Sequence, residues 1–515
     1  MTGALARYSW RAIAAPAGLF LLFFTIMALV QFATPDLPDN DGFYHIRIAQ
    51  LMRTEGLKVD FPWLPLTILN QREFSDHHFL FHVALMPFTF GDLRLGAKWA
   101  AVTFAAIAFL SVWWLLSRLR VAYAGLWALG LLAVSEAFLY RMSITRAQSL
   151  SLAFLAAGLY LLFSGKHRWL VPLAFFYVWF YDAFPLLLFL AFLYFFAVLA
   201  LERRLEWRPV AYVGLGILLG MLINPYFPDN VVFFVRHVAP KLSETTSISV
   251  GSEWYPYDTA QLLKNSPLAL VVFLAGALGL GLQKQRMDTP TAVSFMAAVM
   301  FGAMLFQSRR FIEYFPAFAL IFAALTWSPL LSMSGVEEHR SSFSASGKST
   351  LVSWVKSRLT KGRLTQLILV VFLLVGGWMS VRDAQASIRT SKPYTLYADA
   401  SRWLRENTPS GSRVFQTDWD DFPRLFYYNL HNTYLIGLDP TYMQLYDPDL
   451  YELWVDITRG NVEKPSEHIY PRFGASYVIS DLKHGKFLRV AEEDPGLKEV
   501  FRDQDAVIYQ LIQSP

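Results

Sequence analysis

Residues 38–47 read Pro-Asp-Asn-Asp-Gly-Phe-Tyr-His-Ile-Arg and follow directly on the first long apolar run of the chain, residues 12–33. This order places the side chains of Asp39, Asp41 and His45 where a helix leaves a lipid bilayer. Ionisable groups at such a place are costly to hold and usually carry function. The stretch therefore predicts a membrane protein with a reactive site at the membrane surface.

The composition agrees with a membrane protein. Of the 515 residues, 55% are hydrophobic and 17% are charged, whereas soluble domains hold about 45–50% apolar and about 25% charged residues. The chain has no cysteine, which excludes disulfides and thiolate chemistry. The first run lacks a cleavage site of small residues, so we expect a retained helix rather than a signal peptide. We predict a polytopic α-helical membrane protein with about eleven spans: 12–33, 96–117, 122–139, 147–164, 169–181, 184–201, 209–224, 267–283, 290–307, 311–331 and 364–381.

Lysine and arginine in the connections predict the orientation, because cytoplasmic connections carry an excess of both. Alternation of the predicted spans places the basic connections on one side, which we assign to the cytoplasm. The amino terminus is then inside, and the carboxyl terminus is outside the inner membrane. The formal charge of +5 is modest, so nucleic acid is not implied as a partner. The basic connections hold Arg7/Arg11, Arg118/Arg120, Lys166/Arg168, Arg203/Arg204/Arg208, Lys284/Arg286 and the segment 340–363.

Two domains are expected from this division. Residues 1–381 would form the transmembrane domain, with outer loops at about 34–95 and 225–266, and a helix over 43–55 would lie at the membrane interface. Residues 382–515 are long enough for a small extracytoplasmic α/β domain. The elements expected in that tail are strands at 413–416, 433–436, 477–479 and 506–509, and helices at 394–406 and 448–458.

The acidic pair admits two interpretations. Aspartate is a preferred helix N-cap, and Asp41 fits that role for a helix beginning at Gly42. Alternatively, Asp41, and with less support Asp39, acts as a general base or cation ligand at the boundary with water. His45 lies one turn beyond Asp41 and would by default be a hydrogen-bonding residue. His77 and His78 are further candidates for the same site.

Four arginines occupy short outer connections, where positive charge is disfavoured. They are Arg141, Arg146, Arg309 and Arg310. Some would pair with acidic residues, for which Glu136, Glu313 and Asp182 are the candidates. The alternative is a site for a phosphate or pyrophosphate, which arginine holds through two parallel hydrogen bonds. Two clusters on one face favour a lipid phosphate.

Two further segments are candidates for substrate contacts. Residues 247–254 form a serine-rich outer loop that contains Glu253, and loops of this kind often close over a substrate. The tail opens with Asp418, Trp419 and Asp420 after an expected strand. An aromatic ring flanked by carboxylates suits an acceptor made of sugar or peptide. An ordinary solvated loop and a structural turn are the respective alternatives.

Together these elements resemble the oligosaccharyltransferase catalytic-subunit family of bacterial and archaeal type, within the GT-C superfamily of membrane glycosyltransferases. The resemblance covers the architecture of nearly the whole chain. It implies that Asp41 is the carboxylate of the family's first acidic motif and that Glu253 is its mobile-loop glutamate. Arg310 would contact the phosphate of the donor lipid, and Trp419 lies in an altered form of the motif that reads the acceptor.

The sequence departs from this family at one place that concerns metal binding. The family has a second acidic pair in the outer loop after the third helix, whereas residues 140–148 contain no carboxylate and two arginines. Hard divalent cations prefer several oxygen ligands. We therefore expect a metal-independent relative. If a cation is used, Mg²⁺ or Mn²⁺ held by Asp41 and Glu253 is the candidate.

The expected function is transfer of a sugar from a polyprenyl-phosphate or pyrophosphate donor to an acceptor at the outer membrane face, with inversion. Asp41 would act as base, and Arg310, with Arg309 and Arg146, would stabilise the departing phosphate. The acceptor would be a glycan, a lipid or a protein. The alternatives are an oligosaccharyltransferase acting on protein, and a transporter or scaffold for lipid-linked glycans.

Overall fold

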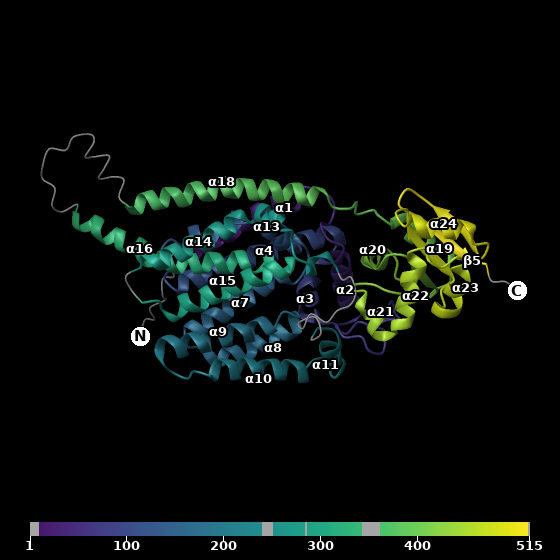
Figure 1. Cartoon of the computed structure of the whole chain (residues 1–515), viewed down its shortest axis with the longest axis horizontal. Coiled ribbons are helices and arrows are strands. Elements are labelled where there is room, and N and C mark those ends of the chain that lie inside the picture. The colour runs from purple at the N-terminus through teal and green to yellow at the C-terminus, as the bar shows by residue number, and fades with distance from the viewer. Residues whose placement is uncertain (1–9, 239–250, 284–285, 342–360, 513–515) are drawn as a thin grey trace, which may run out of the picture.

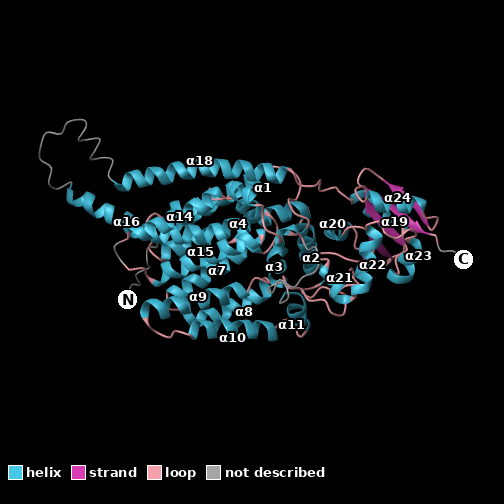
Figure 2. Ribbon diagram, viewed as in Figure 1, coloured by secondary structure: helices cyan, strands magenta, loops and turns pink. Residues whose placement is uncertain are grey.

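The computed structural model describes residues 10–238, 251–283, 286–341 and 361–512. Long helices form one body, and a small sheet with its own helices lies at the end that carries the carboxyl terminus (Figure 1). All strands in these described ranges belong to that sheet (Figure 2). The helices of the body are α1 (Trp10–Gln31), α4 (Leu93–Arg118), α5 (Ala124–Leu129), α6 (Glu136–Ser143), α7 (Gln148–Phe163), α8 (Leu170–Phe180), α9 (Pro185–Glu202), α10 (Arg208–Leu222), α14 (Pro267–Leu282), α15 (Thr289–Gln307), α16 (Phe315–Ser341) and α18 (Lys361–Arg389).

Shorter helical segments cover the end of the body that faces the sheet. They are α2 (Asp41–Glu55), α3 (Phe79–Leu85), α11 (Asp229–Phe233), η4 (Phe234–Val238), η5 (Ser252–Trp254), α13 (Thr259–Asn265) and η6 (Arg309–Glu313). Helices α2 and α3 fall in the predicted outer loop 34–95. The segments α11, η4, η5 and α13 fall in the predicted outer loop 225–266.

Fewer helices qualify as membrane spans than the sequence predicted. Among the described residues, four are long and apolar enough by length and composition, and six qualify if each of two bent pairs is one span. The multi-helical membrane architecture is thus confirmed, whereas the count of eleven is not. The predicted span 122–139 is broken before Ser135, whose hydroxyl accepts the Phe138 N–H and caps the new helix α6. Serine favours such a cap over a helix interior because its short side chain competes for backbone donors.

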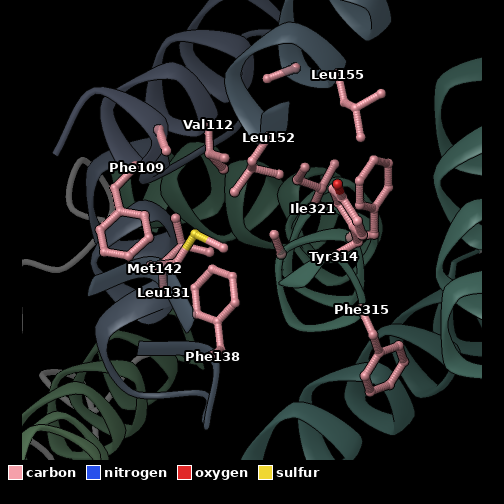
Figure 3. Close-up of a cluster of buried hydrophobic side chains, with 14 of the residues drawn as sticks. Phe109, Val112, Leu131, Phe138, Met142, Leu152, Leu155, Tyr314, Phe315 and Ile321 are labelled. Atoms are coloured by element: carbon pink, nitrogen blue, oxygen red, sulfur yellow. The ribbon is translucent and has the colours of Figure 1, made fainter. Parts of the chain in front are cut away.

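The body is held together by apolar side chains from helices that are distant in sequence (Figure 3). Phe109 of α4, Met142 of α6, Leu152 of α7 and Ile321 of α16 are almost completely buried in one cluster. Close packing of this kind is what associates helices in a membrane. It fixes α6, and the loop that follows α6 carries Arg146 into the site.

Helix α2 is covered on both sides. Nine of its fifteen residues are buried, so the helix is packed inside the protein. Its position at the membrane interface stays a prediction. On one side, the tail covers the helix: the ring centre of Phe426, a tail residue, lies 5.7 Å from that of Tyr44. Asn40, rather than Asp41, occupies the N-cap position and makes no side-chain cap bond. Asp41 therefore begins the helix and does not cap it.

The tail contains the predicted mixture of helices and strands. Its sheet has the strand order β2-β1-β3-β5-β4, with β1 parallel to β2 and β3 and with β5 antiparallel to its neighbours. The predicted strands are present, whereas β4 was missed because it is an edge strand with the charged residues Lys498 and Glu499 exposed. The elements are β1 (Arg413–Gln416), β2 (Thr433–Tyr434), β3 (Tyr477–Asp481), β4 (Leu497–Arg502), β5 (Ala506–Leu511), α19 (Ala398–Asn407), η7 (Trp419–Asp421), α20 (Phe422–Tyr428), α21 (Thr441–Tyr446), α22 (Pro448–Thr458), α23 (Ser466–His468), η8 (Ile469–Phe473) and α24 (Gly485–Glu493).

Candidate functional site

A cavity of about 240 Å³ lies between the helical body and the tail. Its walls come from α2, the segments around α3, the turn after α8, the turns η5 and η6, and the start of α21. The structure brings together at this cavity seven residues that the sequence singled out: Asp41, His45, His77, His78, Arg146, Glu253 and Arg310.

Arg146 makes contact with three carboxylates. Its Nε and Nη2 donate to the two oxygens of Asp39 at 2.6 and 3.0 Å. Nη2 also lies 2.7 Å from Asp41 Oδ2, and Nη1 donates to Glu253 Oε2 at 3.1 Å. A guanidinium has five N–H donors in a planar fork, and here that fork ties the start of α2 to η5.

Arg141 was predicted to contact a phosphate, but in the structure it binds two carboxylates. Its Nε donates to Glu313 Oε1 at 2.8 Å, and its Nη1 donates to Glu253 Oε2 at 2.9 Å. Glu313 is fully buried, and a buried carboxylate needs such a partner. Pairing with Glu313 was one of the alternatives open from the sequence. Arg141 is not among the residues that line the cavity.

The two neighbouring arginines of η6, Arg309 and Arg310, point to different surroundings, and only Arg310 lines the cavity. Arg309 donates from Nε to the Pro256 carbonyl at 3.2 Å, lies over the Tyr257 ring and does not line the cavity. Arg310 does line it, donates from Nη2 to the Tyr181 hydroxyl at 2.6 Å and lies 3.7 Å from Glu253. Its guanidinium also lies 4.8 Å from the centre of the Trp254 ring. Within the described residues, these contacts leave some of its five donors available to an anion.

The pKa values of the two carboxylates at the cavity, Asp41 and Glu253, are shifted in opposite directions. Burial raises the pKa of Asp41 to about 7, against the opposing effect of Arg146 and with smaller contributions from Asp39 and Glu253. Burial would also raise the pKa of Glu253, but the guanidiniums of Arg146, Arg141 and Arg310 outweigh it and hold that pKa well below its usual range. A carboxylate with a pKa near 7 is suited to general base catalysis at neutral pH.

Histidines form another wall. His45 Nδ1 lies 2.8 Å from His82 Nε2, and His82 Nδ1 lies 2.7 Å from Asp76 Oδ2, so the three make a buried chain of hydrogen bonds. Burial lowers the pKa of His45 and of His78, which makes both neutral at pH 7. His77 Nε2 lies 3.9 Å from Asp182. The i, i+4 spacing of residues 78 and 82 was the signal that could have pointed to His82.

The predicted acceptor residues lie beside the cavity without lining it. Asp418 accepts the N–H of Asp420 at 3.0 Å, as a structural turn would. Asp420 Oδ2 accepts a hydrogen bond of 2.6 Å from Asn40 Nδ2, so it fastens the tail to the acidic stretch. Trp419 is partly buried and packs on the core of the tail. The tail residues that reach the cavity are Leu438, Asp439 and Tyr442, for which the sequence gave no signal.

The predicted cation ligands do not suit a divalent metal. Asp41 Oδ2 and Glu253 Oε2 are within 2.7 and 3.1 Å of Arg146 nitrogens. Mg²⁺ or Mn²⁺ bridging the same oxygens at about 2.0–2.6 Å would have to occupy the space of that guanidinium. In the described ranges, no group of three or more histidines and carboxylates is arranged to hold a metal ion.

The comparison with known sequences gives one informative relative. No protein-family model matches the chain. Dolichyl-phosphooligosaccharide-protein glycotransferase 3 of Archaeoglobus fulgidus is 28% identical over 228 residues, which are 42% of this chain. The chain spans about a quarter of that relative's length. The matching relative is an oligosaccharyltransferase, in agreement with the resemblance predicted from the acidic stretch.

Solved structures resemble the chain over nearly its whole length. The apo oligosaccharyltransferase of A. fulgidus has a TM-score of 0.64 at 16% identity, covering 98% of this chain and 75% of that one. The same enzyme in complex with Zn and sulfate gives 0.62 at 15%, covering 96% and 73%. ArnT of Cupriavidus metallidurans bound to undecaprenyl phosphate gives 0.58 at 15%, covering 97% and 99%. The chain has the fold of the GT-C membrane glycosyltransferases, as its sequence predicted.

Proposed function

We propose that the chain is a glycosyltransferase that moves a sugar from a polyprenyl-phosphate or pyrophosphate donor to an acceptor at the membrane surface. The observation that carries this proposal is that Asp41 and Arg310 face the same cavity. One offers a carboxylate with a pKa of about 7, and the other offers a guanidinium with N–H donors to spare. The fold, and the undecaprenyl phosphate bound by the similar ArnT, support a lipid-linked donor.

The reaction follows from these two groups. The Asp41 carboxylate accepts the proton of the acceptor's nucleophilic group, a hydroxyl in the simplest case, while the oxygen of the acceptor forms a bond to C1 of the sugar. The bond from C1 to the phosphate oxygen breaks, and its electron pair leaves on the phosphate. Arg310 stabilises that developing charge by charge-assisted hydrogen bonds. A single displacement from the opposite side inverts the configuration at C1.

Only one of the four outer arginines is assigned to the donor phosphate. Arg310 lines the cavity, and Tyr181 and Trp254 hold its guanidinium on two sides. Arg146 is engaged by three carboxylates, Arg141 is engaged by Glu313 and Glu253, and Arg309 lies outside the cavity. Arg310 is therefore the arginine best placed to receive a phosphate.

We also propose that the cavity opens to the outer side of the inner membrane. It lies at the end of the body where the tail is found, and α16 ends and α18 begins at the opposite end (Figure 1). The basic segment 340–363 connects those two helices, which supports a cytoplasmic location for that end. Transfer to protein by an oligosaccharyltransferase is the second candidate, favoured by the A. fulgidus relative.

The test is sugar transfer from synthetic undecaprenyl-phosphate hexose by the purified full chain in detergent. Membrane glycolipid extract and a peptide with an Asn-X-Thr sequon serve as separate acceptors. We expect Asp41→Asn to lower turnover by about 10²–10⁴-fold, the usual contribution of a general base. Asp60→Asn is the matched control, because Asp60 is exposed and does not line the cavity. Equal turnover by wild type and Asp41→Asn would refute the assignment, and transfer to the peptide alone would favour the second candidate.

A further inference from the structure

Arg146 lies at the point where carboxylates from two separate segments converge. Asp39 and Asp41 come from the start of α2, and Glu253 comes from η5. Each has an oxygen within 3.1 Å of the guanidinium. Carboxylate oxygens that converge in this way are the ligands that Mg²⁺ and Ca²⁺ prefer in proteins.

We propose that the guanidinium of Arg146 is the fixed cation of this site and positions Asp41 and Glu253 in place of a divalent metal. Arginine stays protonated at any physiological pH, so it supplies permanent positive charge without a dissociable ligand. The activity readout rests on the proposed function, whereas the metal-binding readout does not.

The local charges are close to balance without a metal. The guanidiniums of Arg141, Arg146 and Arg310 face the carboxylates of Asp39, Asp41, Glu253 and Glu313 through direct contacts. Replacing Arg146 by an acidic residue would leave several carboxylates around one gap with their main counter-charge gone. Unpaired carboxylates that are shielded from water take up either protons or a cation.

The position of Arg146 is built into the backbone. Helices α6 and α7 meet at an angle of 105°, and residues 144–147 make the bend between them. Thr145 donates its hydroxyl to the Ala97 carbonyl at 3.0 Å, which ties the bend to α4. A Cβ at Gly42 would lie 3.3 Å from Cβ of Thr145. Helix α2 therefore lies so close to the bend that a side chain at residue 42 would be crowded, and the guanidinium reaches both aspartates.

The experiment is titration of the purified full chain in detergent with Mn²⁺, followed by electron paramagnetic resonance of the bound ion. Wild type should bind no Mn²⁺ at this site, and Arg146→Asp should gain one equivalent. The double variant Arg146→Asp/Glu253→Gln should lose it again. Arg236→Asp is the matched control, because Arg236 is exposed on η4 and is not among the cavity-lining residues.

Two results would overturn the inference. One is a Mn²⁺ ion bound by wild type and lost in Asp41→Asn, because the carboxylates would then hold a metal despite Arg146. The other is a folded Arg146→Asp protein, judged by its unfolding temperature, that gains no Mn²⁺ site. The wild-type titration decides the first result without any variant at position 146.

Activity gives a separate arm of the test. EDTA should leave transfer by wild type unchanged, and Arg146→Lys, which keeps the charge, should retain more transfer than Arg146→Gln. Loss of wild-type transfer on EDTA treatment, with recovery on Mn²⁺, would refute the inference. If wild type transfers no sugar under any condition, the proposed function fails, and the Mn²⁺ titration still decides whether Arg146 replaces a metal.

Discussion

One wall of the cavity, the charged wall, holds Arg146 and its carboxylates, and another, the histidine wall, holds His45 and His78. The two walls differ in how they offset the energetic cost of burying ionisable groups. On the charged wall, the carboxylates of Asp39, Asp41 and Glu253 compensate the buried charge of Arg146. On the other wall, burial lowers the pKa of His45 and His78, so these rings lose their charge. Burial thus favours pairing where opposite charges are present and neutralisation where they are not.

The largest expected effect comes from breaking the buried Glu313–Arg141 pair, which lies behind the charged wall. Glu313→Ala should lower the free energy of unfolding by about 3 kcal/mol, because loss of one partner of a buried ion pair is strongly destabilising. Thermal unfolding in detergent measures it. Glu202→Ala is the control, because the Glu202–Arg204 pair is exposed, and such pairs contribute about 0–1 kcal/mol. Equal losses in the two variants would contradict the contrast between buried and exposed pairs.

Removing the anion-binding group should affect transfer more than stability. Arg310→Gln is expected to lower turnover by about 10²–10³-fold, the usual effect of losing one donor to a developing negative charge. Arg309→Gln is the neighbouring comparison and should change turnover far less, since Arg309 lies outside the cavity. Steady-state turnover with a fixed lipid-linked donor measures both. A larger loss for Arg309→Gln would reverse the assignment of the donor phosphate.

The pH dependence of transfer should report on Asp41. A base must be deprotonated to act, so turnover should rise with pH through about 7, the pKa to which burial raises Asp41. Arg146 lowers that pKa, and Arg146→Gln should therefore move the rise to higher pH, while Arg146→Lys moves it less. Turnover measured between pH 5.5 and 8.5 gives the profiles. A rise at the same pH in Arg146→Gln would show that Asp41 is not the titrating group.

The smallest effect is expected from the histidine wall. Because the folded pKa values of His45 and His78 lie below the unfolded value of about 6.5, the unfolded chain binds more protons as the pH falls. Stability should be highest above that value and should decline as the pH drops below it. Unfolding midpoints measured from pH 8 to 5 test this. The double variant His45→Gln/His78→Gln should decline less steeply, and an unchanged slope would contradict the explanation.

Cavity residues that lie within recognisable local motifs could be predicted from the sequence. Asp41 and Arg310 were found because each lies in a short segment whose charge is unusual for its expected place beside the membrane. Glu253 was found because it lies in a serine-rich outer loop. The strands of the tail were also predicted, since their residues alternate and have high β-propensity. β4 was missed because its charged residues lie at a sheet edge.

Features that depend on distant segments could not be predicted. The pairing of Arg146 with Asp39 and Asp41 requires the 105° bend between α6 and α7. The burial of α2 requires a helix of the tail, α20, that lies far along the chain. Tyr181 and Asp439 join the site only through tertiary packing, and each alone is an ordinary polar residue in the sequence.

The hydrogen bond between Asn40 and Asp420 joins residues that are 380 positions apart. At a synthesis rate of about 5–20 residues per second, Asp420 is made roughly 20–80 s after Asn40. Leu438, Asp439 and Tyr442, which close one side of the cavity, are made later still. The acidic stretch is thus made well before the tail residues that complete its cavity, and the cavity forms only after both have been synthesised.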